Sequence, residues 1–359
     1  MNKTKMINKI AVDVIFTGLI REYDLLRKSI SEMVLLRDEG LINKIIISTW
    51  TGEPQKHPEI LLFLKSNKII ILESKEPKDF GDGNIWCQMK SLEEGLGKSD
   101  PNRFILKTRT DVRINPFFLR KLFSSKEKLL KITKNLPKGN IFKYKVWVPW
   151  FELTKPFFMG DECFFGHYHD LKLFINYDYS YDKKHEINPD KSHVRRFIHP
   201  FLKDYPILYD SLEKYSKERY FKNTLKKLSH DLYVELTKLT FLRKISENNR
   251  FNILNKRLND PRFIELLATY YSILYSHFYI DSWSFPQQVV FREHSEPLFK
   301  SNGEDLEKNF TKERVRILYG GQIYVYDMNF INSFCEKRLN KTPLTIKFMN
   351  SVDKFNKND

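Results

Sequence analysis

Residues 107–113, with the sequence KTRTDVR, hold the side chains in this chain that are best suited to chemistry. They follow the apolar residues 104–106, so we expect a short buried strand that continues into a polar loop. In an open α/β sheet, ligands bind outside the carboxyl ends of the strands. Asp111 could hold a divalent cation against substrate phosphates there, and Lys107, Arg109 and Arg113 suit a diphosphate. The alternative is that Asp111 only caps a helix or a turn.

A second candidate is the pair of adjacent carboxylates Asp161 and Glu162, which stands in the aromatic stretch 155–166. Burial among apolar side chains raises the pKa of a carboxyl group, which suits a general acid or base. The alternative is that Asp161 caps the following turn. The histidines of residues 185–199 have spacings that match no standard metal motif, so we interpret them as surface residues.

The first 115 residues alternate between strand and helix patterns. Predicted strands cover 10–16, 44–50, 68–72 and 103–107, and predicted helices cover 22–39, 58–66 and 84–96. We expect Gly95 and Gly97 to end the third helix. Such an alternation predicts an α/β fold with a parallel sheet and right-handed crossovers. The first strand is not followed by a G-x-G-x-x-G turn, which disfavours a dinucleotide cofactor of the usual kind.

Beyond residue 115 the pattern is less regular. Residues 144–151 predict an edge strand or a wall, because Pro149 cannot donate to a central ladder. Residues 211–250 carry ten Lys and Arg against five Asp and Glu and predict a basic amphipathic helix or helix pair. This helix is either solvated and packed on the domain, or it faces a membrane or an acceptor lipid. Residues 270–276 and 285–291 are predicted to continue the helical part, and 319–326 predict a late hairpin or strand.

Length and composition limit the class of protein. A chain of 359 residues can hold two domains, and we expect a catalytic domain at 1–205, a mainly helical region at 206–349 and a loose tail at 350–359. The net charge of +16 and the pI near 9.4 imply anionic partners, namely nucleotide phosphates, nucleic acid or an anionic membrane. Three isolated cysteines favour a reducing cytoplasm. We find neither a membrane-spanning apolar run nor a signal peptide.

Two segments together resemble a known family. Residues 84–96 read NIWCQMKSLEEGL, and residues 105–111 read ILKTRTD. They resemble the WavE-type lipopolysaccharide-synthesis family, which has an N-I-x-x-Q-x-x-S-x-x-x-G-L helix followed by a K-x-R-[ST]-D loop. The segments 16–18, 45–50 and 160–166 also fit, so the resemblance covers about residues 10–170. Further on, Pro286-Gln287-Gln288 matches a late P-E-Q element with Gln287 in place of its Glu.

The resemblance implies a glycosyltransferase with a GT-A-like, Rossmann-type sheet that is mostly parallel and flanked by helices. Such an enzyme moves a sugar from a nucleotide-sugar donor to a lipopolysaccharide, capsule or other surface-glycan acceptor. The residues that would bind the nucleotide sugar are Thr17, Gly18, Arg21, Asn84, Gln88, Lys107, Arg109 and Asp111. Asp161 would deprotonate the acceptor hydroxyl in an inverting reaction, with Glu162 as its catalytic neighbour.

The resemblance also implies a cofactor. Many GT-A-like enzymes hold Mn²⁺ or Mg²⁺ on the diphosphate with an Asp-x-Asp loop, so we expect a divalent cation at Asp111. Here the loop is Arg109-Thr110-Asp111 and keeps only the last carboxylate. Arg109 could supply part of the positive charge, because a fixed cation stabilises a leaving diphosphate much as a metal does.

Two other classes of function stay open. One is a nucleotidyltransferase or phosphotransferase on the same α/β frame, although the chain has no G-x-x-x-x-G-K-[ST] loop. The other is a nucleic-acid-binding protein, which only the charge favours, since no recognised module is present. We therefore expect a nucleotide-sugar donor, a glycan or lipid-linked glycan acceptor and an anionic membrane surface as partners, and no nucleic acid. The expected location is the cytoplasm, with peripheral attachment to the inner face of the membrane.

Overall fold

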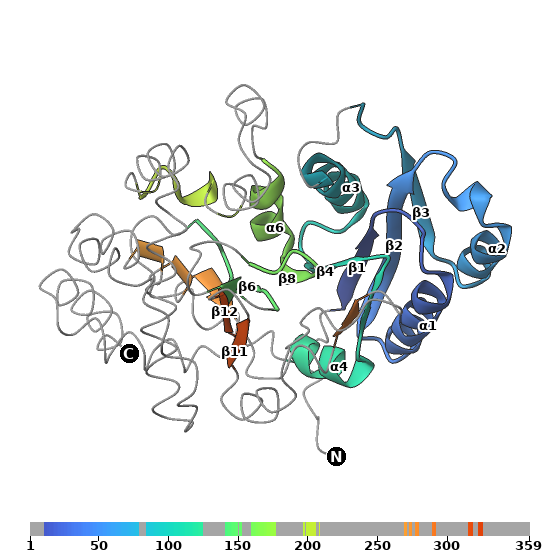
Figure 1. Cartoon of the computed structure of the whole chain (residues 1–359). Helices are drawn as coiled ribbons and strands as arrows, with labels where there is room; N and C mark the ends of the chain where they lie inside the picture. Colours follow the sequence, from blue (N-terminus) through green and yellow to red (C-terminus); the bar gives the residue numbers. More distant parts are fainter. Residues whose placement is uncertain are drawn as a thin grey trace, which may run out of the picture.

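Figure 1 shows the chain as a computed structural model. The structure describes residues 11–78, 84–124, 141–149, 151–152 and 159–176, and beyond these only short pieces. The short pieces are 197, 199–205, 208, 269–270, 273–274, 277–279, 289–291, 315–318 and 322–325. The basic segment 211–250 and the tail from 350 lie outside the described residues.

The centre of the described part is a seven-stranded mixed sheet in the order β3-β2-β1-β4-β8-β6-β9. Its strands are β1 (Val12–Thr17), β2 (Ile42–Trp50), β3 (Ile70–Ser74), β4 (Phe104–Arg109), β6 (Val146–Trp147), β8 (Phe164–His167) and β9 (Phe278–Tyr279). The first four are parallel, as predicted, while β8 runs antiparallel to both β4 and β6. The α/β prediction is thus confirmed for a mostly parallel sheet.

Helices cover both faces of this sheet (Figure 1). They are α1 (Tyr23–Asp38), α2 (Pro58–Ser66), α3 (Ile85–Lys98), α4 (Pro116–Ser124) and α6 (Tyr168–Ile175), with the 3₁₀ turns η1 (Pro54–Lys56) and η3 (His199–Phe201). In Figure 1, α3 and α6 lie on one side of the sheet, and α1 and α4 lie on the other. Leu26, Ile30 and Met33 of α1 are fully buried, as the spacing of three and four residues requires.

Strands from the C-terminal half add to the N-terminal part. The strand β10 (Val289–Phe291) pairs with β5 (Val112–Ile114). A separate three-stranded sheet forms because β12 (Gln322–Val325) pairs with both β11 (Val315–Leu318) and β7 (Phe151–Glu152). The late hairpin or strand predicted at 319–326 corresponds to β12, and its partner β11 lies before the predicted range. The prediction of helix over 285–291 is wrong at 289–291, because pairing with β5 outweighs the weak local helix pattern.

The prediction of an edge strand or wall at 144–151 is wrong for β6, but Phe151 begins β7, which is at the edge of the three-stranded sheet β11-β12-β7. The strand β6 lies inside the sheet, between β8 and β9. Pro149 does not disturb this pairing, because it comes after the strand has ended. The last backbone donor before it, the N–H of Val148, still donates to the carbonyl of Tyr279 at 3.1 Å.

Alternation along the strands separates two sets of side chains. Val14, Phe16 and Leu106 point into the main apolar core, which α1, α2 and α4 close. Their neighbours Ile15 and Lys107 therefore point to the opposite face. That face is covered by α3 and α6 and carries the polar residues described below.

Gly95 lies within α3 and does not end it, which corrects the sequence prediction. The helix continues to Lys98, and the exposed Gly97 is also helical. A Cβ atom added at Gly95 would collide with Cγ2 of Ile15 in β1. The glycine is needed there because the helix approaches the sheet closely.

We expect Gly95→Ala to lower the free energy of unfolding by about 1–3 kcal/mol, as overpacking of a core does. Gly97→Ala is the matched control, because nothing lies within 4 Å of its added Cβ. That control should be neutral or gain up to about 1 kcal/mol from the higher helix propensity of Ala. Urea unfolding of both variants measures the difference, and equal stabilities would contradict the close approach of α3 to β1.

Candidate functional site at the carboxyl edge of the sheet

Hydrogen bonds to β2 and β4 and their loops hold the loop after β1 in place. Thr17, at the end of β1, is buried and donates its hydroxyl to the carbonyl of Thr108 at 3.1 Å. The N–H of Gly18 donates to the carbonyl of Ser48 at 3.2 Å, and its φ of +113° is a conformation that favours glycine. The N–H of Thr110 donates back to the carbonyl of Thr17 at 3.2 Å. The structure therefore joins Thr17 directly to the 107–111 segment and Gly18 to β2.

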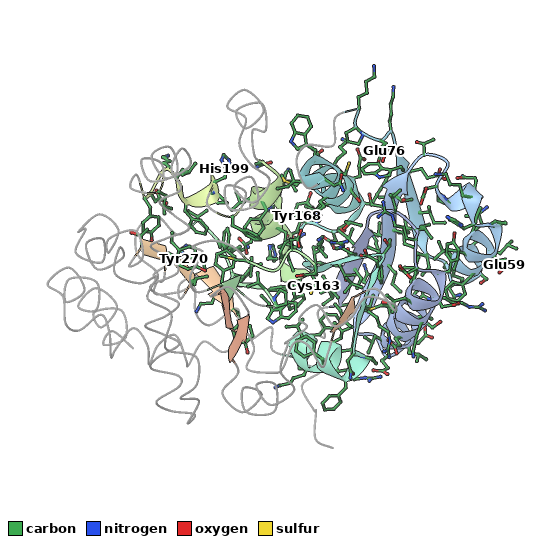
Figure 2. The ribbon with its side chains drawn as sticks, viewed as in Figure 1. Glu59, Glu76, Cys163, Tyr168, His199 and Tyr270 are labelled. Carbon is green, nitrogen blue, oxygen red and sulfur yellow. The ribbon has the colours of Figure 1, made fainter. Side chains whose placement is uncertain are left out.

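The pairing of β4 with β8 joins the two candidate segments of the sequence. Lys107 is the register partner of Phe164, so Asp161 and Glu162 come just before the paired residue on the neighbouring strand. Figure 2 labels Cys163, the residue between them and β8, and it lies near the middle of the molecule. Residues that are about fifty positions apart in the sequence thus meet at the carboxyl edge, which is the end of the sheet where the parallel strands finish.

Lys107 faces inward at this edge. Only 1% of the residue is exposed, its ammonium group donates to the backbone carbonyl of Asp161, and it lies 4.9 Å from the centre of the Phe164 ring. A buried ammonium group is stable only with such partners. This position indicates that Lys107 holds the turn at Asp161 in place. The sequence analysis had predicted that Lys107 binds the nucleotide sugar.

Arg109 and Asp111 form a two-pronged ion pair. Nε of Arg109 donates to Oδ1 of Asp111, and Nη2 donates to Oδ2, both at 2.8 Å. Burial lowers the pKa of Arg109, but the neighbouring Asp111 carboxylate, with Asp161 and Glu162 behind it, raises that pKa by more. The guanidinium group therefore keeps its charge at any physiological pH.

Glu162 is the most unusual carboxylate of the site. It is only 4% exposed, and its Oε2 atom has no hydrogen-bond partner. Burial, and next the neighbouring charge of Asp161, raise the pKa of Glu162 to about 7, although Arg109 and Lys107 favour its ionised form. Asp161 beside it is half-buried. A buried acid with an unsatisfied oxygen and a pKa near neutrality is suited to accepting or donating a proton.

The first turn of α3 lies at the same edge of the sheet. Along the helix, Ser91 donates to the carbonyl of Ser48 near the end of β2, and Gly95 packs on Ile15 in mid-strand. Beyond the helix, the N–H of Asp100 donates to Asp13 near the start of β1. The helix therefore runs against the strands, and its positive N-terminal end is at their carboxyl ends.

The positions of three predicted binding residues follow from the helices beside which they lie. Asn84 is the exposed residue that precedes α3, with a φ of +57°, and Gln88 is half-buried in the first turn of that helix. Arg21 is exposed and lies two residues before α1. Asn84 and Gln88 thus belong to the carboxyl edge, and Arg21 belongs to the connection that follows the loop after β1.

Sequence analysis missed two buried residues that shape the site. Glu53, after β2, accepts from the N–H of Ile20 at 3.1 Å and from Nζ of Lys56 at 2.8 Å. Thr110 donates its hydroxyl to the carbonyl of Leu19. Both fix the loop after β1. Glu53 could have been found, because it follows a buried strand as Asp111 does, but its distant backbone partner has no signal in the sequence.

Further buried ionisable groups lie at the other end of β8 and around β6. Burial raises the pKa of Asp170, in α6, to about 7, although its carboxylate accepts from the N–H groups of Lys143 and Tyr144. Burial lowers the pKa of Lys145 to about 8 and those of His167 and His277 to about 4. These groups contribute to the pH dependence of stability but do not belong to the carboxyl edge.

The residues at this edge do not fit a divalent cation in the arrangement described. Both carboxylate oxygens of Asp111 accept from Arg109. Within the part of the chain that the structure describes, no three His, Cys, Asp or Glu side chains gather into a potential metal site. A cation at Asp111 stays a prediction, and it would require Asp111 to exchange its guanidinium partner.

Comparison with known proteins adds no family. No family model matches the chain, and no curated protein matches it. The WavE-type resemblance therefore rests on the sequence motifs alone. Among the described residues, no helix is both long enough and apolar enough to cross a membrane.

Proposed function

We propose that this protein is a glycosyltransferase with a GT-A-like fold. It would transfer a sugar from a nucleotide-sugar donor to a lipopolysaccharide, capsule or other surface-glycan acceptor. The observation that carries this proposal is the β4–β8 pairing, which brings the 107–111 segment and the Asp161–Glu162 pair together at the carboxyl edge. Ligands of open α/β sheets bind at that edge.

The topology of the sheet supports the same proposal. Counted along the chain, the seven strands lie in the order 3-2-1-4-6-5-7, and only the sixth is reversed. A mostly parallel sheet with one reversed strand beyond the fourth is compatible with a GT-A-like domain. The loop after β1 and the first turn of α3 would then border the nucleotide sugar from two sides.

In the proposed reaction, each of the described groups has its own role. The acceptor hydroxyl oxygen attacks the anomeric carbon, the bond from that carbon to the diphosphate breaks, and the nucleoside diphosphate leaves. Arg109, together with the positive end of α3, would stabilise the charge on the leaving diphosphate. Asp161, half-buried beside the buried Glu162, would take the proton of the acceptor hydroxyl and pass it to the Glu162 carboxylate, whose pKa near 7 lets it hold that proton.

Ligand screening of the full chain tests the proposal. UDP-, GDP-, CMP- and dTDP-sugars should be compared with oligonucleotides in thermal-shift assays, followed by product analysis for any sugar nucleotide that binds. Glycosyl transfer or slow donor hydrolysis that releases the nucleotide would support a glycosyltransferase. Nucleotidyl or phosphoryl products would assign the site to another transferase class, and binding of oligonucleotides alone would contradict the proposal.

The basic segment 211–250 gives a prediction about the acceptor side. A transferase that builds surface glycans would work on lipid-linked acceptors at a membrane, and each Lys or Arg near an anionic bilayer contributes about 1 kcal/mol. We expect the chain to bind anionic vesicles, and this binding should weaken from low to moderate salt. Charge reversal at Lys222, Lys226 and Lys227 should weaken it further in co-sedimentation.

The control for this prediction has the same change of charge elsewhere. It reverses three exposed lysines of the N-terminal part, Lys65, Lys75 and Lys78. If both triple variants lose binding equally, the attraction comes from the total charge of the chain. If neither the salt nor the first triple variant matters, residues 211–250 have no membrane role.

A further inference from the structure

We infer that the Arg109 guanidinium itself holds the donor diphosphate without a resident divalent cation, and that Asp111 is the residue that positions this guanidinium. The inference rests on the proposed function and deepens it, because it names how the site binds the diphosphate. It also replaces the metal role that the family resemblance implies for Asp111.

The relative exposure of the two side chains is the first reason. The Arg109 side chain is 23% exposed, while the Asp111 side chain is 7% exposed. The cation is therefore the outer member of the pair and the carboxylate lies behind it. A diphosphate that arrives from solvent meets the guanidinium first, whereas a metal ion would have to pass it to reach the carboxylate.

The geometry of the pair is the second reason. Asp111 engages Nε and Nη2 along one side of the planar guanidinium, which fixes the plane of the group. Fixing this plane before binding lowers the entropic cost of holding a phosphate in two hydrogen bonds. A carboxylate in this position acts through the arginine, and its own oxygens need not touch the donor.

Electrostatics is the third reason. A divalent cation on Asp111 would lie beside the fixed charge of Arg109, and like charges at such a short separation repel strongly in a buried site. Removing Arg109 from Asp111 to make room would break a largely buried ion pair. One guanidinium already placed at the edge avoids both costs.

Nucleoside diphosphate binding to the full chain tests this inference. UDP, GDP and dTDP should be titrated calorimetrically in EDTA, and then with Mg²⁺ or Mn²⁺. We expect at least one of them to bind, with a Kd that changes by less than about threefold between these conditions. Arg109→Gln should weaken that binding by roughly tenfold or more, because a charge-assisted contact to phosphate is lost.

Variants of the positioning residue and a matched ion pair complete the test. Asp111→Asn should weaken binding less than Arg109→Gln, and the double variant should bind no worse than Arg109→Gln alone. Arg113→Gln is the control, because Arg113, which the sequence analysis grouped with Arg109, instead forms a two-pronged pair with Glu32 of α1, on the other face of the sheet. It should leave the Kd unchanged, and thermal unfolding of each variant separates lost binding from lost folding.

The outcomes separate this inference from the proposed function. Binding that requires Mg²⁺ or Mn²⁺ and disappears in EDTA would overturn the inference while leaving a nucleotide-sugar enzyme in place. A folded Arg109→Gln variant with unchanged binding would do the same. If the wild-type chain binds no nucleoside diphosphate under any of these conditions, the proposed function fails, and the inference fails with it.

Discussion

Replacing Glu162 by Gln is expected to lower the rate of sugar transfer by on the order of 10²–10³, while the protein stays folded. The change keeps the shape of the side chain and removes its ability to take up a proton. General acid–base groups typically contribute 10²–10⁴ in rate, about 3–5 kcal/mol. Steady-state assays with a saturating donor measure the loss, and a variant with near-normal transfer would exclude Glu162 from catalysis.

The control is Asp170, a second buried carboxyl group among the described residues whose pKa burial raises to about 7. It lies in α6, at the opposite end of β8 from Glu162. Asp170→Asn should alter stability, because it changes the acceptor for two backbone N–H groups. It should leave the rate of transfer within a few-fold of wild type, so the comparison separates proton transfer from burial of a charge.

The pH dependence follows from the same group. A base must be ionised, and the pKa of Glu162 is about 7. The transfer rate of the wild type should therefore rise as pH increases through about 7 and then level off. The residual activity of Glu162→Gln should lack that rise. A wild-type profile that is flat between pH 6 and 8 would contradict the role of Glu162.

The stability that Glu162 contributes should change with pH in the opposite direction to the transfer rate. The folded state raises the pKa of Glu162 from its usual value near 4.5 to about 7, so the folded protein binds its proton more tightly than the unfolded chain does. This contribution to stability is present below pH 4.5 and is lost as pH rises to about 7. The stability of the wild type relative to Glu162→Gln should fall over that range by on the order of 1–3 kcal/mol.

Only the difference in stability between the wild type and Glu162→Gln is informative, because other groups titrate in the same pH range. Asp170 has the same sign as Glu162, since its pKa is also raised to about 7. His167 and His277 have pKa values lowered to about 4, so their contributions rise with pH over part of the same range. These groups are present in both proteins and largely cancel in the difference.

Asp111→Asn is expected to reduce transfer by a similar factor, on the order of 10²–10³, or roughly 3–4 kcal/mol. An asparagine has one oxygen, so it cannot give Nε and Nη2 of Arg109 a separate acceptor each, and its NH₂ group faces one of the two donors. The guanidinium then loses its fixed plane and its charged partner. The rate should be measured with and without EDTA, because loss without any effect of EDTA on the wild type is what a positioning residue predicts.

Glu32→Gln is the matched control for this change. It removes the carboxylate that pairs with Arg113, only two residues from Asp111 in the sequence, but on the α1 side of the sheet. We expect near-normal transfer from Glu32→Gln. If both variants lose activity to the same extent, the loss at Asp111 reflects damage to the β4–β5 region, and no special role for the Arg109 pair is needed.

Local patterns in the sequence were sufficient for the N-terminal half of the fold. The predicted helix 58–66 agrees with α2, and the predicted strands and helices up to residue 107 each overlap an observed element. These elements are long or strongly apolar, and apolar periodicity depends only on neighbours along the chain. Gly95 was misinterpreted because a glycine that ends a helix and one that allows close packing look the same in sequence.

The short strands beyond residue 140 were decided by tertiary structure. Val146–Trp147, Phe278–Tyr279 and Val289–Phe291 have two or three residues each and exist through their pairing partners. Periodicity cannot show itself over two residues, so no local pattern could have placed β6 inside the sheet or turned 289–291 into a strand. Their partners are up to about 180 residues away in the chain.

For the candidate site, the amino-acid sequence alone determined which residue types stand where the buried strands end: Thr17 and Gly18 at the end of β1, and Arg109 and Asp111 at the end of β4. Only the tertiary structure decided that the Asp161–Glu162 pair meets them, that Lys107 turns inward to Asp161, and that Arg109 engages both oxygens of Asp111. The physical reason is that the charge and burial of each group depend on partners across strands. The sequence specifies the groups, but the raised pKa of Glu162 exists only once β8 has paired with β4 and this carboxyl group is buried.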